Sequence, residues 1–489
     1  MGGSARKILI PSFQLSVLAA PADEGAIKRT LRIPNDHVDF SYYHRPDKSV
    51  DGGRIYSLFP MVIDKRGAPW KIGLLYLLSK IEDEVDPVMA TLESSATDLA
   101  AFKDWIDNIG LDDDFIFNID EKKQRRPTYR YLNFLRLSVQ AGVIARSTAK
   151  RRMRTVISLY RWLIKVGEIP SDSPFWENKF YRIEIRGAEG RPMLRGIEST
   201  DLIIPGAENK TPFDGTIKDG GSLRPLLHNE QNWILEAAIA KGNTECFLIQ
   251  LFILGTGARI ESACTLRLNH FSNPAPEYTR DKISGGEVYR LRAGPGTGID
   301  TKGSKSGVFQ IPRQLYEALH IYGRSTRAVV RRERLALQYG THPNIYLFIT
   351  NRGSPYYASK DDRAAFMSRR GRRYVINGQS VRQFVKDHAV LYVRERYDRA
   401  FNYRIHDLRA TYGMNITELL MQKVGVNELT LDRARNLVKE LMWHASTETT
   451  DLYINYRDEI DRYFAAIDGY GKYLGEWADR AMKGSVNGN

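Results

Sequence analysis

The amino-acid sequence predicts a mainly α protein with a small antiparallel β-sheet. Two observations favour this fold class: apolar residues recur at helical spacing in several segments, and one strand–turn–strand pattern interrupts them at 286–312. A third observation, a stretch dense in glycine and proline, separates the helical segments into two groups. The predicted regions are a mixed N-terminal region at 1–85, a helical domain at 86–182, a linker at 183–226, a second helical domain at 227–460 and a tail at 461–489.

The N-terminal region is predicted to contain strands, of which IYSLFPMVI at 55–63 is the clearest, since aromatic and β-branched residues dominate it. In the helical domain, Thr97 is placed to cap a helix with Leu99, Phe102 and Ile106 on one face and Gly110 after its end. The sequence therefore changes from strand to helix before residue 100.

Two further helices complete the predicted helical domain. Pro127 favours a helix start, because its missing N–H and fixed φ suit the first helical turn. Ser147 begins a third helix, in which Met153, Val156 and Tyr160 form an apolar stripe beside four cations. We expect this helix to bury the stripe and to lay its basic flank against a polyanion.

Composition and charge restrict the class of protein. The 489 residues carry a formal net charge of +14, and a soluble protein this basic usually meets a polyanion such as nucleic acid. No uncharged apolar run is long enough for a membrane span, and the first residues lack a signal-peptide pattern. The cations gather in clusters that we assign to DNA binding: Lys122, Lys123, Arg125, Arg126, Lys150, Arg151, Arg152, Arg154, Arg369, Arg370, Arg372 and Arg373.

The two cysteines and the carboxylates indicate what chemistry to expect. Cys246 and Cys264 lie in apolar helical segments without metal-ligand spacing, which is typical of buried thiols in a reducing cytoplasm. No carboxylate cluster of the two-metal kind and no phosphate-binding G-x-x-x-x-G-K-[ST] loop occurs. We therefore expect chemistry that is independent of metal and ATP, with no cofactor.

Four segments of the second helical domain carry candidate catalytic residues. Arg259 follows an apolar helix and a glycine turn at the start of another helix, a position suited to an anion. Lys302 lies in a turn that enters a strand, and His406 and Arg409 are three residues apart on one helical face. The fourth segment, LMWHASTETTDLYINY at 441–456, places His444 nine residues before Tyr453.

This ordered set resembles the tyrosine recombinase (phage integrase) family over residues 86–460. The resemblance implies a helical core-binding (SAM-like) domain followed by a tyrosine-recombinase catalytic domain. It implies that Arg259 and Arg409 hold the scissile phosphate, that Lys302 protonates the leaving 5′ oxygen, and that Tyr453 is the nucleophile. It also implies acid–base duty for His406 and a hydrogen bond from His444 to the phosphate.

Each assignment agrees with the chemistry of its residue type. In-line attack on a phosphodiester builds negative charge on the equatorial oxygens, which fixed cationic donors stabilise. A phenol with a pKa near 10 needs a base or a cationic field before it attacks, and a lysine whose pKa neighbouring arginines lower can serve as an acid. Lys305 competes with Lys302 for the lysine role, and Tyr456 competes with Tyr453 for the nucleophile.

The sequence departs from the family pattern at three positions. Ala258 stands where the family usually has leucine, Ala410 where it often has a second histidine, and Trp443 where it usually has glycine. None of these changes removes a catalytic group. For Trp443 two interpretations stay open, namely a position against the phosphate or ordinary packing.

The resemblance implies a site-specific recombinase that integrates, excises or transposes a mobile element through a 3′-phosphotyrosyl intermediate. Its partners would be double-stranded DNA recombination sites, a homotetramer on DNA and accessory recombination proteins, in the cytoplasm of a prokaryotic cell and on its nucleoid, away from membranes. Two alternatives remain: a type IB topoisomerase, and a non-catalytic DNA-binding regulator with the same fold. Residues 1–85 either bind a separate DNA arm or cap the helical domain, and the tail either docks on a neighbouring subunit or folds back on its own domain.

Overall fold

The computed structural model describes residues 3–32, 39–48, 53–84, 87–186, 192–204, 215–281, 285–341, 344–363 and 375–459. The chain divides into two compact units. The first unit holds Met1–Lys210 and Met367–Tyr374, and the second holds Thr211–Phe366 and Val375–Asn489. The tail at 461–489 and the cluster Arg369, Arg370, Arg372 and Arg373 lie outside the described residues.

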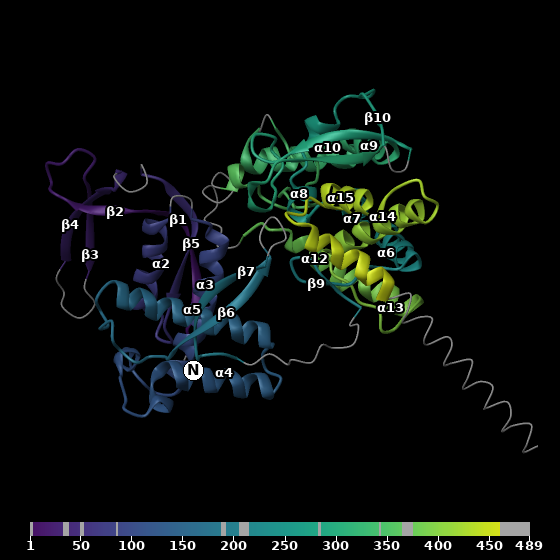
Figure 1. Ribbon diagram of the computed structural model, residues 1–489. Helices are drawn as coiled ribbons and strands as arrows, with labels where there is room; N and C mark the ends of the chain where they lie inside the picture. The colour runs from purple at the N-terminus through teal and green to yellow at the C-terminus, as the bar shows by residue number, and fades with distance from the viewer. Residues whose placement is uncertain are drawn as a thin grey trace, which may run out of the picture. The chain divides into compact units, whose positions relative to one another are not determined.

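The first unit combines small antiparallel sheets with helices (Figure 1). Strand β1 pairs with β5 along its whole length, and β4 lies between β2 and β3 in a separate sheet. The predicted strand at 55–63 is confirmed as β5. The elements of this unit are β1 Arg6–Gln14, β2 Ser16–Ala19, β3 Ile27–Arg32, β4 Asp39–Pro46, β5 Ile55–Ile63, α2 Lys71–Asp83, α3 Met89–Asn108, the 3-10 turns η1 Asp113–Phe117 and η2 Lys123–Arg125, α4 Pro127–Gln140, α5 Arg146–Lys165, β6 Asn178–Arg186 and β7 Pro192–Thr200.

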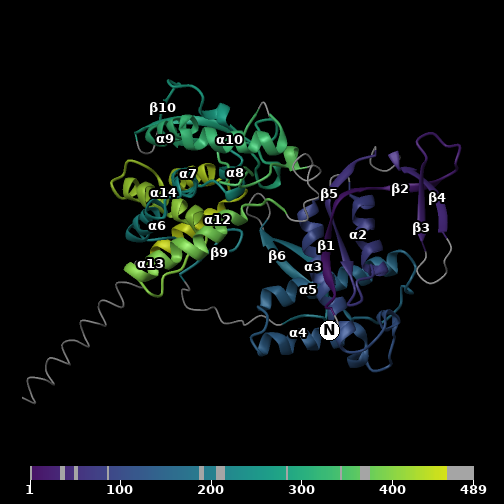
Figure 2. The same cartoon turned by 180° about the vertical axis from the view of Figure 1, so that it is seen from behind.

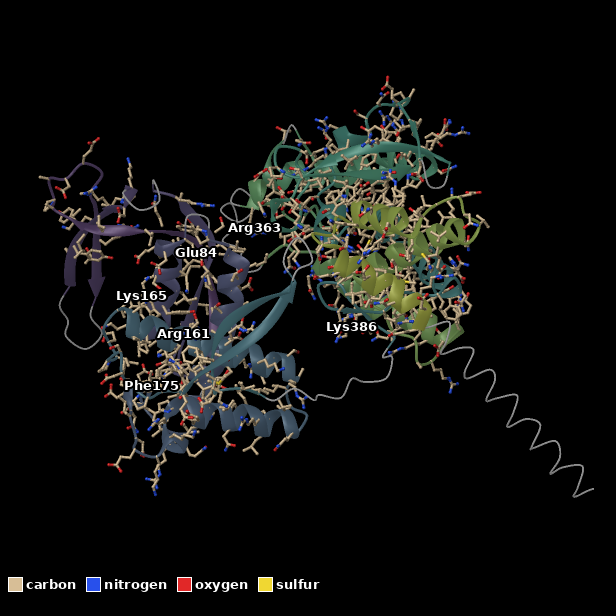
Figure 3. The ribbon with its side chains drawn as sticks, in the orientation of Figure 1. Glu84, Arg161, Lys165, Phe175, Arg363 and Lys386 are labelled. Carbon is tan, nitrogen blue, oxygen red and sulfur yellow. The ribbon has the colours of Figure 1, made fainter. Side chains whose placement is uncertain are left out.

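One core joins the N-terminal strands to the helices. Phe59 of β5 is buried together with Leu99 and Phe102 of α3, and both views of the ribbon show α3 beside β5 (Figure 2). Farther along the chain, Phe175 lies under α5, with its ring centroid 4.7 Å from that of Tyr160 (Figure 3). Strands β1 and β5 therefore pack on the predicted helical domain, while binding of a DNA arm by residues 1–85 stays a prediction.

Helix boundaries follow the sequence signals with one exception. Helix α4 begins at Pro127 and α5 begins at Arg146, one residue before the predicted start. Helix α3 begins at Met89, so the prediction that Thr97 caps it is wrong. The Thr97 hydroxyl instead donates to the carbonyl of Glu93, 2.8 Å away, which lets a threonine lie inside a helix.

The second unit is mainly helical with a three-stranded antiparallel sheet, β10–β11–β12. The predicted strand–turn–strand pattern is confirmed: β11 pairs with β12 from Val288↔Pro312 to Ala293↔Gly307. Its elements are β8 Ile217–Lys218, β9 Ser222–Leu223, α6 His228–Ala240, α7 Thr244–Thr256, α8 Ile260–Cys264, η3 Leu268–Phe271, β10 Thr279–Arg280, β11 Glu287–Ala293, η4 Lys302–Ser304, β12 Gly307–Pro312, α9 Arg313–Arg324, α10 Thr326–Tyr339, α12 Gln379–Phe384, the π-helical η5 Val385–Ala389, α13 Val390–Arg396, α14 Asp407–Gly425 and α15 Leu431–Met442, and residues 447–459 are also helical.

The stretch 183–226, predicted as a linker, contains regular structure. The hairpin β6–β7 extends into it, and β8 and β9 form a second, very short hairpin near its end. Gly220 and Gly221 thus lie in the turn of a hairpin. Cys246 and Cys264 are buried free thiols, and no helix in the described ranges is long and apolar enough to cross a membrane.

Candidate active site

The turn between α7 and α8 positions Arg259. Helix α7 ends at Gly257, whose φ of 67° is left-handed, and a Cβ there would lie 2.5 Å from the ring of Tyr412. Glycine is therefore required for the turn. Arg259 comes directly before α8, as predicted, and burial and the neighbouring guanidinium of Arg409 lower its pKa. Within the described residues, no hydrogen bond or ion pair engages the Arg259 guanidinium.

Arg409 ties three segments of the unit together from the first turn of α14. Its side chain is buried and donates to the carbonyls of Gly257 and Met442. Its Nε also lies 3.4 Å from a carboxylate oxygen of Asp219. The guanidinium is thus fixed between the end of α7, the end of α15 and a segment far earlier in the chain.

His406 lies at the N-terminal end of α14, one turn before Arg409. Burial, together with the charges of Arg409 and Arg259, lowers the pKa of His406 to about 4. The ring is therefore neutral at physiological pH and can accept a proton. Asp407 holds this end of the helix, because its carboxylate accepts the backbone N–H groups of Arg404 at 2.7 Å and Arg224 at 3.2 Å.

The backbone conformation of Trp443 explains why the sequence pattern has glycine directly before His444. The residue ends α15 with φ 53° and ψ 40°, a left-handed conformation that glycine adopts without cost. The tryptophan ring stacks on Phe309, with centroids 4.6 Å apart, and a Cβ at Gly307 would lie 2.5 Å from that ring. Packing against β12 thus accompanies the left-handed backbone, and the packing interpretation accounts for Trp443.

His444 and Tyr453 lie face to face beyond α15. Their ring centroids are 5.6 Å apart, and Tyr453 is fully buried on the helix at 447–459. Gly413 of α14 makes room for the phenol, since a Cβ there would collide with the Tyr453 ring. The rival hydroxyl of Tyr456 donates instead to the carbonyl of Gly215, 3.3 Å away.

Asp219 was not predicted from the sequence. Its carboxylate accepts the hydrogen bonds of three side chains of this site. Its Oδ2 accepts from the Tyr453 hydroxyl at 3.0 Å, from His444 Nε2 at 3.3 Å and from Arg409 Nε at 3.4 Å. Burial alone would raise the pKa of Asp219, but the hydrogen bond from His444 and the charge of Arg409 hold it well below its usual range. Burial and this carboxylate raise the pKa of Tyr453 well above its usual value.

The ionised carboxylate also indicates where His444 carries a proton. A carboxylate only accepts hydrogen bonds, so Nε2 must carry a proton. Nδ1 and the hydroxyl of Thr450 share a hydrogen bond 3.0 Å long. His444 therefore presents an N–H group to the position that Asp219 Oδ2 occupies.

The turn that carries Asp219 also lies beside Lys302. A Cβ at Gly220 would be 3.7 Å from the Lys302 Nζ atom, whereas Lys305 lines a hollow together with Trp443 and His444. Both lysines are exposed. The structure thus brings Arg259, Lys302, His406, Arg409, His444 and Tyr453 around a single turn, Asp219–Gly220.

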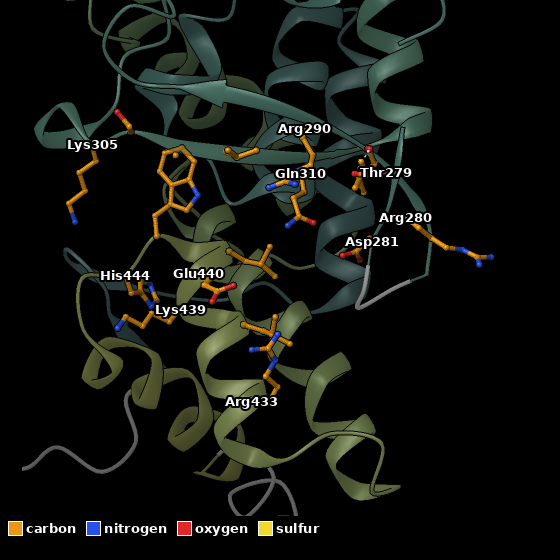
Figure 4. Close-up of a pocket in the computed structure, with 17 residues that line it drawn as sticks. Thr279, Arg280, Asp281, Arg290, Lys305, Gln310, Arg433, Lys439, Glu440 and His444 are labelled. Atoms are coloured by element: carbon orange, nitrogen blue, oxygen red, sulfur yellow. Dashed lines mark hydrogen bonds between the residues drawn. The ribbon is translucent and has the colours of Figure 1, made fainter. Parts of the chain in front are cut away.

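The residues that line the hollow beside His444 include five cations and two carboxylates: Arg280, Arg290, Lys305, Arg433 and Lys439, with Asp281 and Glu440. Its volume is about 760 Å³, and Figure 4 shows Arg290 and Lys305 facing it from the β11–β12 hairpin. Arg433 and Lys439 face it from α15. Such a surface suits phosphate groups that continue from the site.

The predicted DNA-binding cations of the first unit differ in burial and in whether they already have partners within the fold. Arg126 donates to three backbone carbonyls, Lys123 pairs with Glu177 at 3.0 Å, and Arg151 pairs with Asp98 at 2.9 Å. The Arg152 side chain is partly buried. The remaining cations are exposed and make no ion pair with another described residue: Lys122, Arg125, Lys150 and Arg154.

Comparisons with known proteins give structural likenesses only. No protein-family model matches the chain, and no curated protein sequence matches it. The Tn1549 transposon integrase in complex with circular intermediate DNA is similar, with a TM-score of 0.40, 13% identity and coverage of 78% of this chain and 94% of that one. A lambda integrase dimer bound to a core site has a TM-score of 0.38 and 13% identity, covering 78% of this chain and 93% of that one. Lambda integrase is also similar as a tetramer bound to a Holliday junction, where the TM-score is 0.38, the identity 13% and the coverage 78% and 76%.

Proposed function

We infer that this protein is a tyrosine recombinase that cleaves and rejoins DNA strands through a 3′-phosphotyrosyl intermediate. One observation carries the inference: a phenol, an arginine and a histidine N–H converge on a single oxygen atom, beside an Arg259 guanidinium that no hydrogen bond joins to another described residue. Donors that meet at one point form a site for one anionic oxygen. A hydroxyl at the edge of such a site is placed to attack the group that the anion belongs to.

The proposed reaction uses each residue once. The Tyr453 oxygen attacks phosphorus in line, its proton passes to the neutral ring of His406, and the bond from phosphorus to the 5′ oxygen breaks. Lys302 gives a proton to that leaving oxygen. Arg259, Arg409 and the Nε2–H of His444 stabilise the charge on the equatorial oxygens, and attack by a free 5′ hydroxyl reverses the steps.

The stoichiometry follows from one nucleophile per chain. Two duplexes have four strands, so exchange of all of them requires four copies of Tyr453. We therefore propose a homotetramer on two double-stranded recombination sites, acting in the integration, excision or transposition of a mobile element. The ester keeps the energy of the broken bond, so no ATP is required.

A covalent-trapping experiment tests this function. The substrate is a nicked duplex taken from DNA that flanks the gene, so that the released fragment diffuses away and the adduct accumulates. We expect a denaturation-resistant protein–DNA adduct from the wild type and from Tyr456→Phe, but none from Tyr453→Phe. An adduct that survives in Tyr453→Phe and disappears in Tyr456→Phe would contradict the assignment.

A further inference from the structure

Asp219 occupies a turn with little structure of its own. The turn joins β8 and β9, which share two ladder pairs, Ile217↔Leu223 and Lys218↔Ser222. Ile217 and Leu223 anchor the hairpin in the same core as Tyr453. Gly220 follows with a φ of 70°, which lets the chain reverse directly after the carboxylate.

The oxygen atom of Asp219 lies where the proposed reaction places an oxygen of the phosphate. Arg409, His444 and Tyr453 all donate to Oδ2. Carboxylate and phosphate oxygens accept the same charge-assisted hydrogen bonds from the same donors. Arg259 lies in the same cluster, and no hydrogen bond joins its guanidinium to another described residue.

The carboxylate and a reacting phosphate exclude each other. A phosphorus atom ready for attack lies roughly 3–3.5 Å from the nucleophile. Asp219 Oδ2 already lies 3.0 Å from the Tyr453 oxygen. Two anions in that space would repel strongly, because little water remains there to screen them.

We propose that the carboxylate of Asp219 is a built-in substitute for a phosphate oxygen, and that a phosphodiester binds productively only after the β8–β9 hairpin withdraws it. This inference rests on the proposed function, which identifies the anion that competes with the Asp219 carboxylate as a DNA phosphodiester. While Asp219 is in place, Tyr453 donates a hydrogen bond to its carboxylate and stays a phenol. Withdrawal removes that anion and leaves the hydroxyl among cations, so that occupation by DNA and activation of the nucleophile are coupled.

The tip of the hairpin is suited to such withdrawal while Ile217 and Leu223 stay buried, since Lys218 and residues 220–222 are exposed and a two-stranded hairpin has little stability of its own. A general-base role for Asp219, in place of His406, is the competing interpretation, because its carboxylate already accepts a hydrogen bond from the Tyr453 hydroxyl. The two roles differ in what happens when the carboxylate is removed.

Inorganic phosphate, titrated into the full chain by calorimetry, tests the inference without DNA. We expect Asp219→Asn to bind phosphate at least about tenfold more tightly than the wild type, because the donors lose their internal acceptor. Glu261→Gln is the matched control, since it removes one negative charge beside Arg259 but leaves Asp219 in place. We expect the control to change phosphate affinity by less than about threefold. Equal gains in both variants, or no gain in Asp219→Asn, would overturn the inference.

A second measurement covers loss of folding. If Asp219→Asn or Asp219→Ala unfolds because its cations repel, phosphate must raise the Tm of the variant more than that of the wild type. A variant that phosphate does not stabilise counts against the inference. Covalent trapping then separates the two ideas: a wild-type adduct without the phosphate effect refutes only the anion substitute, and the phosphate effect without any adduct refutes only the proposed function.

Discussion

Two buried clusters in the second unit are built from the same residue types. They differ in whether the side chains of their arginines and histidines already have hydrogen-bond partners. The Asp219 cluster contains Asp219, Arg259, His406, Arg409, His444 and Tyr453. The Asp362 cluster contains Arg267, His270, Tyr346, Ser359 and Asp362. Each has an aspartate between an arginine and a tyrosine hydroxyl, and each has a histidine whose pKa is lowered to about 4, by burial first.

In the Asp362 cluster the cation is fully engaged within the fold. All three nitrogens of Arg267 donate, to Gly298, Asn344 and Ser359, and Nη2 also lies 2.8 Å from the Asp362 carboxylate. In the Asp219 cluster, by contrast, the side chains of Arg259 and His406 make no hydrogen bond to another described residue. A buried aspartate–arginine–tyrosine set is therefore no mark of a catalytic site by itself. A cation beside it without a hydrogen-bond acceptor, as Arg259 is among the described residues, is what suits an external anion.

The largest expected effect comes from the two arginines. Arg409→Ala should lower adduct formation by about a thousandfold, because it removes a fixed donor to the developing charge. Arg267→Ala should lower the free energy of unfolding by about 3–5 kcal/mol, because it leaves the Asp362 carboxylate buried and unpaired. Trapping assays and urea unfolding measure the two quantities on the same samples. If Arg267→Ala is folded but lacks cleavage activity, the Asp362 cluster is not purely structural and the distinction between the two clusters is wrong.

The exposed lysine beside the turn gives the next effect. Lys302→Ala should reduce cleavage of normal DNA by about 10²–10⁴-fold, because the leaving oxygen loses its acid. A substrate with a 5′-bridging sulfur has a better leaving group, so its cleavage by Lys302→Ala should approach the wild-type rate. Lys305→Ala, which alters the hollow of Figure 4, is the control and should show no such selective recovery. Recovery in Lys305→Ala alone would transfer the role to Lys305.

Sequence patterns predict the framework of the Asp219 cluster because its parts follow local rules. A glycine turn precedes Arg259, and the strand–turn–strand pattern becomes β11 and β12. Asp219 could not be predicted in the same way. Its strands have two residues each, too short for any alternation, and a dense run of glycines and prolines surrounds them. The only local signal is an aspartate before Gly220 and Gly221, which is common to many turns.

Long-range contacts account for the other differences. Nothing local distinguishes Arg267, which pairs with Asp362 and donates to Ser359, 92 positions away, from an arginine that awaits a ligand. Trp443 combines a left-handed backbone with packing of its ring on Phe309 and against Gly307, and neither residue lies near it in the sequence. Residue type and spacing predict where a cation lies along the chain. Only the fold determines whether its hydrogen bonds are already made.

The two histidines separate stability from catalysis. An unfolded histidine titrates near 6.5, and both rings titrate near 4 in the folded chain. Below pH 6.5 the unfolded chain therefore takes up protons that the folded chain does not, so the free energy of unfolding decreases as the pH falls toward 4. His406→Gln and His270→Gln should each reduce this loss between pH 7.5 and pH 5.0 by about 1 kcal/mol or less, after allowance for solvent screening. Only His406→Gln should also impair cleavage at pH 7.5, and impairment in both variants would contradict the distinction.

The smallest expected effect extends the same distinction to the first unit, where cations are either engaged or exposed. Lys150 and Arg154 are exposed on α5, and no ion pair joins them to another described residue, whereas Arg126 donates to three carbonyls and Lys123 pairs with Glu177. Each phosphate contact contributes about 0.9 to the slope of log affinity against log salt. The double variant with alanine at 150 and 154 should therefore reduce that slope by up to about 1.8, while alanine at 123 and 126 should leave it unchanged and lower the Tm instead. Fluorescence anisotropy on a duplex of arbitrary sequence, over a series of salt concentrations, measures both slopes. An equal reduction in the two double variants would mean that hydrogen bonds within the fold do not decide which cations meet DNA.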